Sequence, residues 1–265
     1  MATENHYTFG DSERAARRLL LLARAYDAPS RALLERFAPA EAELALDLGC
    51  GPGHTTRLVH EVVRARRTIG VDASARYVDE AVRSAPAGVE FVRQDLLSPP
   101  YSMPPAELVF SRFLLTHLAD PAAALVHFKG LVRDGGVLLL QETSSLEAEH
   151  SALRRYYELV GALQAHYGQI LYIGGELERI AHGVGFETVS FADRKFELPA
   201  STMAEIHAQN LASWRSDPFA VGSFDARELD ELESRLLKLS TGVETASPVE
   251  VGLGELALRV GTVSA

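Results

Sequence analysis

The turn after the first apolar run is the feature that most constrains this chain. Residues 43–48 (ELALDL) are mostly apolar and pass directly into the glycine-rich sequence GCGPG at 49–53. An amphipathic stretch follows from about 54 to 66, with apolar Leu58 and Val62 on one face. This order predicts a buried strand, a tight turn and a helix. Because glycine is required where a ligand approaches bare backbone, the junction predicts a ligand-binding turn in an α/β sheet.

The spacing of the three glycines narrows the choice of ligand. Gly49, Gly51 and Gly53 stand two residues apart, whereas the fingerprint of dinucleotide-binding folds places its third glycine three residues after the second. That fingerprint sets a pyrophosphate on the N-terminus of the following helix. The spacing therefore counts against a nicotinamide cofactor.

Short apolar runs alternate with amphipathic stretches along the rest of the chain. Helices are predicted over 74–85 and from Asp120-Pro121 onward, where Asp is a favourable cap and Pro a favourable first residue. Connections of this kind place helices on both faces of a parallel sheet. We therefore expect an α/β fold with a seven-stranded, mostly parallel sheet. The strands predicted after the first are 67–73, 89–96, 107–115, 137–143, 187–198 and 249–261.

One domain is expected, because no linker, repeat or low-complexity tract interrupts the 265 residues. Its first and last segments each hold two predicted helices in addition to the alternating series. The expected segments are an N-terminal helical cap (1–41), a ligand-binding core (42–143), a helical lid between strands five and six (144–182), and C-terminal strands and helices (183–265).

Acidic residues stand at the ends of two further predicted strands. Asp72 ends the second strand, and Asp95 lies at the end of the third. Open α/β sheets bind ligands at the C-terminal ends of their strands, beside the switch point. A carboxylate at the end of the second strand can accept hydrogen bonds from both hydroxyls of a ribose, as in dinucleotide folds. The two acids therefore favour a ligand that contains a nucleoside.

A series of motifs resembles those of a known family. LDLGCGPGHTT, GVDAS, VRQDL, LVFSRFLLTHLADP and LVRDGGVLLLQE, within roughly 43–143, are similar to the successive motifs of class I S-adenosylmethionine (SAM) dependent methyltransferases. GGELERIAHGVGFETVSF at 174–191 is similar, more weakly, to the sixth strand of that family and its preceding helix. The resemblance implies a Rossmann-like fold, SAM as the cofactor and S-adenosylhomocysteine (SAH) as its product.

The resemblance also implies roles for individual residues. Asp72 would hold the ribose, and Asp95 would accept from the adenine amino group. The residues implied at the methionine end of SAM are Asp47, Gly49, Gly51, Gly53 and Ser111, and those implied at the adenosine end are Asp72, Ala73, Ser74, Asp95 and Leu96.

The N-terminal segment extends the resemblance. Tyr7-x-Phe9-Gly10, followed by Arg17-Arg18, resembles a leader of small-molecule members in which an arginine binds the SAM carboxylate. The planar guanidinium suits that charge-assisted pairing. By its spacing, Arg18 is the candidate for this arginine, and the resemblance also implies that Tyr7 contacts the cofactor. The alternative for Arg18 is a solvated helix residue.

Two residues are candidates for the chemistry. His117 follows the fourth strand and is interpreted either as a general base or as a residue that organises the loop. Glu142, at the end of the fifth strand, either orients the acceptor or is a loop carboxylate. A metal site is not expected, because no histidine pair has metal-ligand spacing with a carboxylate. Further histidines that either reach the pocket or lie on the surface are His150, His166 and His207.

Tyrosines recur through the predicted lid. They either form an aromatic wall for the acceptor or pack the helix on the sheet. The four are Tyr156, Tyr157, Tyr167 and Tyr172.

Composition limits the partners. The formal net charge of −10 argues against a nucleic-acid partner, because phosphate binding requires concentrated Lys and Arg. No run approaches the roughly 20 apolar residues that span a bilayer, and Leu19–Leu22 is too short for the core of a signal peptide. With one cysteine, Cys50, these features predict a cytoplasmic protein. A small-molecule acceptor is the expected partner, and both a monomer and a homodimer stay open.

Two functions fit these observations. The first is methyl transfer by in-line displacement to O, N or C of a small molecule, of the kind found in secondary metabolism. The second is a SAM-binding protein of the same fold that does not methylate, because cofactor motifs indicate binding rather than turnover.

Overall fold

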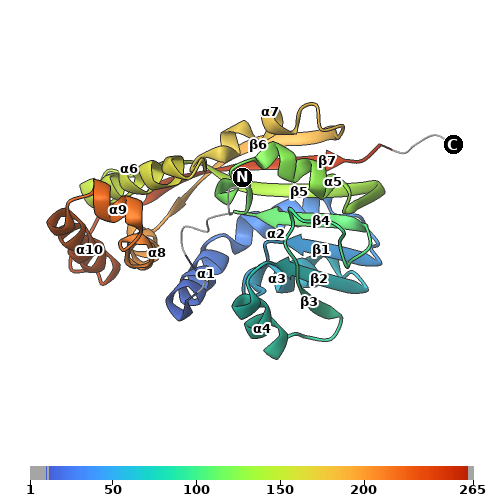
Figure 1. Cartoon of the computed structure of the whole chain (residues 1–265), viewed down its shortest axis with the longest axis horizontal. Helices are drawn as coiled ribbons and strands as arrows, with labels where there is room; N and C mark the ends of the chain where they lie inside the picture. Colours follow the sequence, from blue (N-terminus) through green and yellow to red (C-terminus); the bar gives the residue numbers. More distant parts are fainter. Residues whose placement is uncertain (1–9, 11, 262–265) are drawn as a thin grey trace.

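Seven strands form one sheet that is flanked by helices (Figure 1). The computed structural model describes residue 10 and residues 12–261. The strand order is β3-β2-β1-β4-β5-β7-β6, with β7 antiparallel to β5 and β6 and the other neighbouring pairs parallel. The predicted seven-stranded, mostly parallel α/β fold is confirmed. The strands are β1 (Leu44–Leu48), β2 (Arg67–Asp72), β3 (Val89–Arg93), β4 (Ala106–Arg112), β5 (Val132–Glu147), β6 (Glu187–Leu198) and β7 (Val249–Arg259).

Helices cover both faces of the parallel half of the sheet. The faces are packed by α2 and α3 on one side and by α5 and α7 on the other. In the part of the chain that the structure describes, no helix is long and apolar enough to cross a membrane. The helices are α1 (Glu13–Ala25), α2 (Asp27–Phe37), α3 (His54–Val63), α4 (Ala75–Arg83), α5 (Pro121–Lys129), α6 (Ser151–His166), α7 (Leu177–Ala181), α8 (Ala200–Trp214), α9 (Pro218–Ser223) and α10 (Ala226–Ser240), with short 3-10 turns at Leu115–His117 and Ile173–Glu176.

The burial of β1 explains why its sequence is apolar on both faces. All five of its residues are buried. Leu46 and Leu48 join the cluster that includes α5 and α7, whereas Ala45 joins the cluster of α2 and α3. Successive side chains of a strand point to opposite faces, so a central strand covered on both sides needs an apolar run. Asp47 is the polar exception in this strand.

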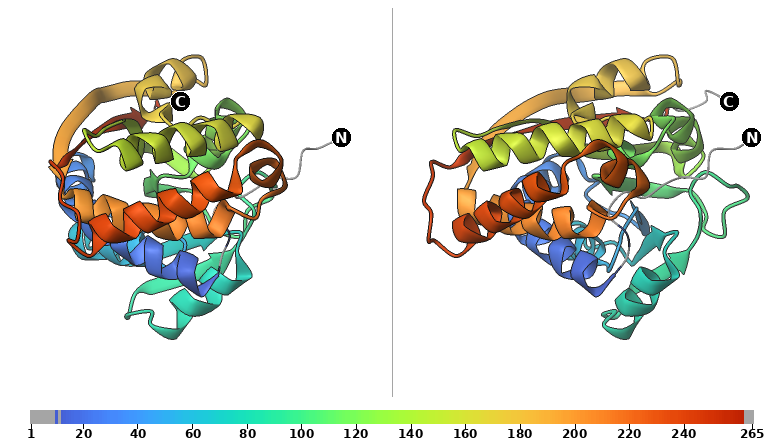
Figure 2. Two further views of the ribbon diagram at one scale, coloured as in Figure 1. Left: turned by 90° about the vertical axis from the view of Figure 1, so that its left-hand side faces the viewer. Right: turned by 60° about the vertical axis from the view of Figure 1, so that its left-hand side comes forward.

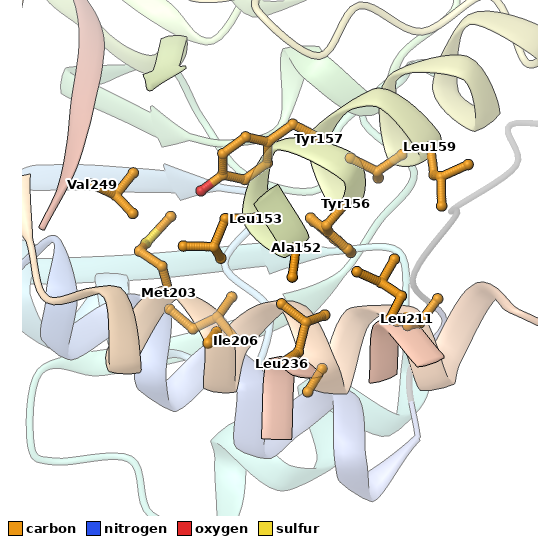
Figure 3. Packing of buried hydrophobic residues seen from close by; sticks show 14 of the residues in the cluster. Ala152, Leu153, Tyr156, Tyr157, Leu159, Met203, Ile206, Leu211, Leu236 and Val249 are labelled. Atoms are coloured by element: carbon orange, nitrogen blue, oxygen red, sulfur yellow. The ribbon is translucent and has the colours of Figure 1, made fainter. Parts of the chain in front are cut away.

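A second apolar core lies beyond the parallel half of the sheet. It joins α6, α8 and α10 with the start of β7. In both views of Figure 2, α8 lies between α6 and α1, and α8 contacts both α1 and α10. Figure 3 shows side chains of α6, among them Leu153, directed toward Met203 and Ile206 of α8. This packing places a helical wall beside the strand ends that carry the predicted site.

The strands β3 and β4 each end three residues before the end that the sequence predicts. β3 ends at Arg93, because the Asp95 carboxylate accepts from the Leu97 backbone N–H at 2.9 Å and closes a turn. β4 ends at Arg112, because Phe113 adopts a φ of 55°, a left-handed value that interrupts a strand.

β5 is longer than the predicted 137–143. It runs from Val132 to Glu147, because its second half pairs with β7 instead of leaving the sheet. The first helix of the predicted lid therefore starts at Ser151. The short helix α9 has no counterpart in the sequence prediction.

Candidate functional site

A cavity of about 610 Å³ opens at the C-terminal ends of β1, β2 and β4. One side consists of the glycine turn and the loops after β2 and β3. The other side consists of α1, α6 and α8. The predicted site residues that line the cavity are Arg18, Gly49, Gly51, Asp72, Ala73, Ser74, Asp95, Leu96 and His117. The predicted site residues absent from its wall are Asp47, Gly53, Ser111 and Glu142, while Tyr7 lies outside the described residues.

The glycine turn has the left-handed backbone that its composition predicts. Gly49, Gly51 and Gly53 have φ values of 72°, 52° and 81°. The N–H groups of Gly49 and Cys50 both donate to the Val71 carbonyl, at 2.8 and 3.0 Å, which ties the turn to β2. Only glycine adopts these angles without steric penalty. The turn therefore presents bare backbone of Gly49 and Gly51 to the cavity.

Gly53 allows close packing against Phe91 and does not line the cavity. A Cβ at this position would lie 2.5 Å from the Phe91 ring of β3. A third glycine in such turns allows close approach of helix and strand. Its place under the turn explains why it is a glycine although it does not line the cavity.

Asp47 links the two ends of the glycine turn, β1 and α3. Its side chain is 1% exposed, and one carboxylate oxygen accepts from the hydroxyls of Thr55 and Thr56 at 2.6 and 2.7 Å. Burial raises the pKa of Asp47 to about 6, against the lowering effect of the two hydroxyls. The two bonds fix the end of β1 to the first turn of α3.

Asp72 faces the cavity and is held by backbone on both sides. One carboxylate oxygen accepts from Gly51 N–H at 2.8 Å, and the other accepts from Ser74 N–H at 2.8 Å. These two bonds fix the plane of the carboxylate at the edge of the cavity. The side chain is therefore oriented and remains suited to accept from a vicinal pair of hydroxyls.

The loop after β3 forms the outer edge of the cavity. The exposed Asp95 carboxylate accepts from Leu97 N–H and from the Ser98 hydroxyl at 2.9 and 2.8 Å. The Leu96 side chain is buried and lines the cavity beside it. Ala73, at the end of β2, lies on the same wall. Two apolar side chains and a carboxylate on this part of the wall suit a flat ring that carries an amino group.

Arg18 reaches the cavity from α1. It is 2% exposed, and its Nη1 donates to Asn210 Oδ1 of α8 at 2.6 Å. Arg18 is thus buried in the cavity wall, unlike a solvated helix residue, and its binding of a cofactor carboxylate stays a prediction. The bond also joins the N-terminal cap to the wall formed by α8.

Arg112 is a second buried guanidinium in the wall, which the sequence prediction did not include. Its Nη1 donates to the Ser30 hydroxyl at 2.8 Å and to the Tyr26 carbonyl at 3.4 Å. Burial lowers the pKa of Arg112 to about 10, and Asp47 partly offsets that effect. An arginine inside a run predicted as a buried strand was the signal available in the sequence.

His117 lines the cavity just after β4, at the end of a 3-10 turn. Burial, together with the charge of Arg18, lowers the pKa of His117 to about 3. The imidazole is therefore neutral near pH 7 and able to accept a hydrogen bond. Its loop is held by Gln169, whose side-chain N–H donates to the His117 carbonyl at 3.1 Å.

Glu142 and Ser111 lie behind the cavity wall. Glu142 is 0% exposed, and its Oε1 accepts from the backbone N–H groups of Leu114 and Leu115 at 2.8 and 2.7 Å. Burial raises the pKa of Glu142 to about 8, against the effect of these N–H groups. The Ser111 hydroxyl donates to the Leu48 carbonyl at 3.3 Å. Glu142 therefore positions the loop that carries His117, whereas Ser111 links β4 to the end of β1.

Aromatic side chains form the wall opposite the glycine turn. Tyr156 and Tyr157 of α6 line the cavity, whereas Tyr167 and Tyr172 are not part of its wall. Of the further histidine candidates, His207 of α8 lines the cavity and His150 and His166 do not. His54, at the start of α3, also lines it and was not predicted.

The sheet order and the glycine turn with its acidic partner define a Rossmann-like fold of the methyltransferase type. The chain belongs to the family described as "Methyltransferase domain", whose sequence profile matches residues 16–191. The predicted membership is confirmed.

Curated relatives match part of the chain. Trans-aconitate 2-methyltransferase of Escherichia coli O7:K1 is 34% identical over 129 residues, which cover 48% of this chain and 50% of that protein. The enzyme of the same name from E. coli O157:H7 is 30% identical over 163 residues, which cover 57% of this chain and 63% of that protein. The chain spans about half to two thirds of the length of these relatives.

Solved structures share the fold. A putative methyltransferase from Bacillus halodurans has a TM-score of 0.59 at 15% identity, over 93% of this chain and 100% of that one. Phosphoethanolamine N-methyltransferase 2 of Haemonchus contortus, solved with SAH, has a TM-score of 0.55 at 17% identity, over 92% of this chain and 58% of that one. The [4+2]-cyclase SpnF has a TM-score of 0.57 at 17% identity, over 91% of this chain and 83% of that one.

Proposed function

We propose that the chain is a SAM-dependent methyltransferase that transfers the methyl group to O, N or C of a small molecule. One observation carries the proposal: a single cavity joins the glycine turn and its acidic edge to an apolar, aromatic wall. The first half suits the cofactor, and the second suits an acceptor held against it. Family membership supports the same assignment.

The residues of the first half fit SAM. Asp72, already oriented by Gly51 and Ser74, would bind the ribose hydroxyls. The adenine would lie against Leu96, and the Asp95 carboxylate would accept from its amino group. The bare backbone of Gly49 and Gly51 would border the methionine end. The buried guanidinium of Arg18 would neutralise the cofactor carboxylate, a charge that is costly to bury unpaired.

When bound, the cofactor supplies a methyl group on a positively charged sulfur. The chain's own task is to hold the acceptor atom in line with that methyl, at about 3–3.5 Å before attack. α1, α6 and α8 surround this position and exclude water. A neutral His117 can accept a proton or hydrogen bond from a hydroxyl acceptor, and an amine acceptor needs only to be neutral.

The segments have distinct proposed tasks within one domain. The segment 1–41, of which residue 10 and residues 12–41 are described, would act as the cap, and 42–143 would bind the cofactor. Residues 144–182 form the lid, and residues 183–265 complete the sheet and the acceptor wall. The contacts of α8 with α1 and with α10 support one continuous unit.

Methyl transfer is tested by incubating the purified chain with SAM and a panel of phenols, amines and carboxylic acids, trans-aconitate included. Release of SAH with a methylated product is expected. Tight binding of SAM without consumption across the panel would favour the alternative, a SAM-binding protein that does not methylate. Methylation of tRNA or DNA is not expected at a net charge of −10.

A further inference from the structure

The acceptor side of the cavity is made by α6 and α8. The family profile ends at residue 191, so α8 lies outside the matched segment. The lining side chains of α6 are Tyr156, Tyr157, Val160 and Gln164, and those of α8 are Met203, Ile206, His207 and Asn210. None of these eight described residues carries a formal charge near neutral pH.

His207 is the imidazole among these eight side chains. It is 5% exposed, and its ring stacks on Tyr156 at 4.2 Å between centroids with an interplanar angle of 21°. Tyr157 meets the same ring edge-on at 5.2 Å. These two contacts fix the plane of the imidazole against α6.

Neither ring nitrogen of His207 has a hydrogen-bond partner among the described residues. A buried polar atom without a partner costs roughly 1–3 kcal/mol, and such atoms are rare in folded proteins. Burial lowers the pKa of His207 to about 3, so the ring is neutral near pH 7, with one N–H donor and one acceptor nitrogen. The ring therefore holds one donor and one acceptor that no described residue satisfies, and both lie covered just behind the cavity surface.

The uncharged side chains that α6 and α8 contribute to the cavity disfavour a polyanion as the bound molecule. The arginines that line the cavity, Arg18, Arg93 and Arg112, lie on α1, β3 and β4 rather than on α6 or α8, and Arg18 Nη1 already donates to Asn210. A molecule with three carboxylates, such as trans-aconitate, would bring three negative charges against neutral aromatic and aliphatic side chains. Burying a carboxylate without a cation or several donors is strongly unfavourable. An uncharged molecule incurs no such penalty.

We propose that His207 binds the acceptor, and that the acceptor is an uncharged, largely apolar ring compound with a hydroxyl group. The hydroxyl pairs with an imidazole nitrogen, and the ring lies against Tyr156, Tyr157 and Met203. This inference rests on the proposed function, because it assigns the substrate class of that same cavity.

The test is calorimetric binding to the full chain saturated with SAH. The probes are 2-naphthol, which has an uncharged hydroxyl near pH 7, 2-naphthoate, which carries a carboxylate on the same rings, and trans-aconitate. We expect 2-naphthol to bind at least tenfold more tightly than either anion. Tighter binding of an anion, or no binding of 2-naphthol, overturns the proposal.

Variants separate recognition from packing. His207→Phe keeps the stack on Tyr156 and should weaken 2-naphthol binding about tenfold, whereas His207→Gln retains a donor and an acceptor and should recover most of it. His166→Phe is the matched control, because His166 stacks on Phe219 at 4.2 Å and does not line the cavity.

SAH affinity should be unchanged in all three variants, and each should still unfold cooperatively on heating. Wild-type affinity of His207→Phe for 2-naphthol would overturn the role of His207. Failure of the wild-type chain to bind SAH would instead contradict the proposed function itself.

Discussion

The carboxylate of Asp72, at the end of β2, accepts a hydrogen bond from the Gly51 backbone N–H at 2.8 Å. The acid predicted to hold the ligand thus also holds the turn that borders the same ligand. Because Gly51 has a φ of 52°, this bond stabilises a conformation that few residues other than glycine adopt. The glycine turn and its acidic partner therefore act as one structural unit.

Asp72→Asn is expected to raise the Kd for SAM at least tenfold. The amide has one acceptor oxygen, so it cannot accept from both Gly51 and Ser74 and still bind the ribose hydroxyls. Titration calorimetry with SAM and SAH measures the change. Asp79→Asn, an exposed acid on α4, is the control. An unchanged Kd in Asp72→Asn would contradict the ribose assignment.

Gly53→Ala is expected to destabilise the fold through two effects. A left-handed φ of 81° costs alanine about 1–2 kcal/mol, and the new Cβ would lie 2.5 Å from Phe91, which adds about 1–3 kcal/mol. Gly242→Ala is the matched control, with a φ of 76° and no atom within 4 Å of its Cβ. Urea unfolding should show the larger loss for Gly53→Ala, with partial recovery when Phe91→Leu is added.

His117→Gln is expected to lower kcat at least tenfold while the Kd for SAM stays within twofold, because general-base catalysis contributes about a hundredfold or more. The pKa of His117 is lowered to about 3, so its imidazole stays unprotonated between pH 5 and 8. The pH profile of the wild-type kcat should therefore show no change caused by His117 in this range. Exposed His182→Gln is the control. Unchanged kcat would leave His117 as a residue that organises the loop.

The order of strands and helices was predictable because it depends on local patterns. The apolar run of β1, the cap at Asp120 and the glycines of the turn each act through neighbours in the sequence. Strand ends were less predictable. Phe113 adopts a left-handed φ within a run that otherwise favours a strand, and β5 continues to Glu147 because β7, more than a hundred residues later, pairs with it.

The positions of Asp72 and Asp95 on the cavity wall were also predictable, because parallel strands bring their C-terminal ends together. Asp72 and Asp95 could therefore be placed from strand positions alone. The wall formed by α6 and α8 could not be predicted in this way. The hydrogen bond between Arg18 and Asn210, which links α1 to α8, joins residues 192 apart in the sequence. No local pattern shows that α8 faces α1. His207 was a candidate by residue type, and the tertiary packing places it on the wall.

Glu142→Gln is expected to change how stability depends on pH. The folded pKa of Glu142 is raised to about 8 from its ordinary value of 4.5, so between these values the folded chain binds more protons than the unfolded chain. The wild type therefore loses stability as pH rises from about 4.5 to 8.

Glutamine keeps the oxygen that accepts from Leu114 and Leu115 and does not ionise. The free energy of unfolding of Glu142→Gln, relative to wild type, should rise by about 2–4 kcal/mol between pH 5 and 8, at about 1.36 kcal/mol per pKa unit. Urea unfolding across this range, with exposed Glu187→Gln as the control, measures it; a constant difference between Glu142→Gln and wild type would mean that Glu142 is ionised in the folded chain.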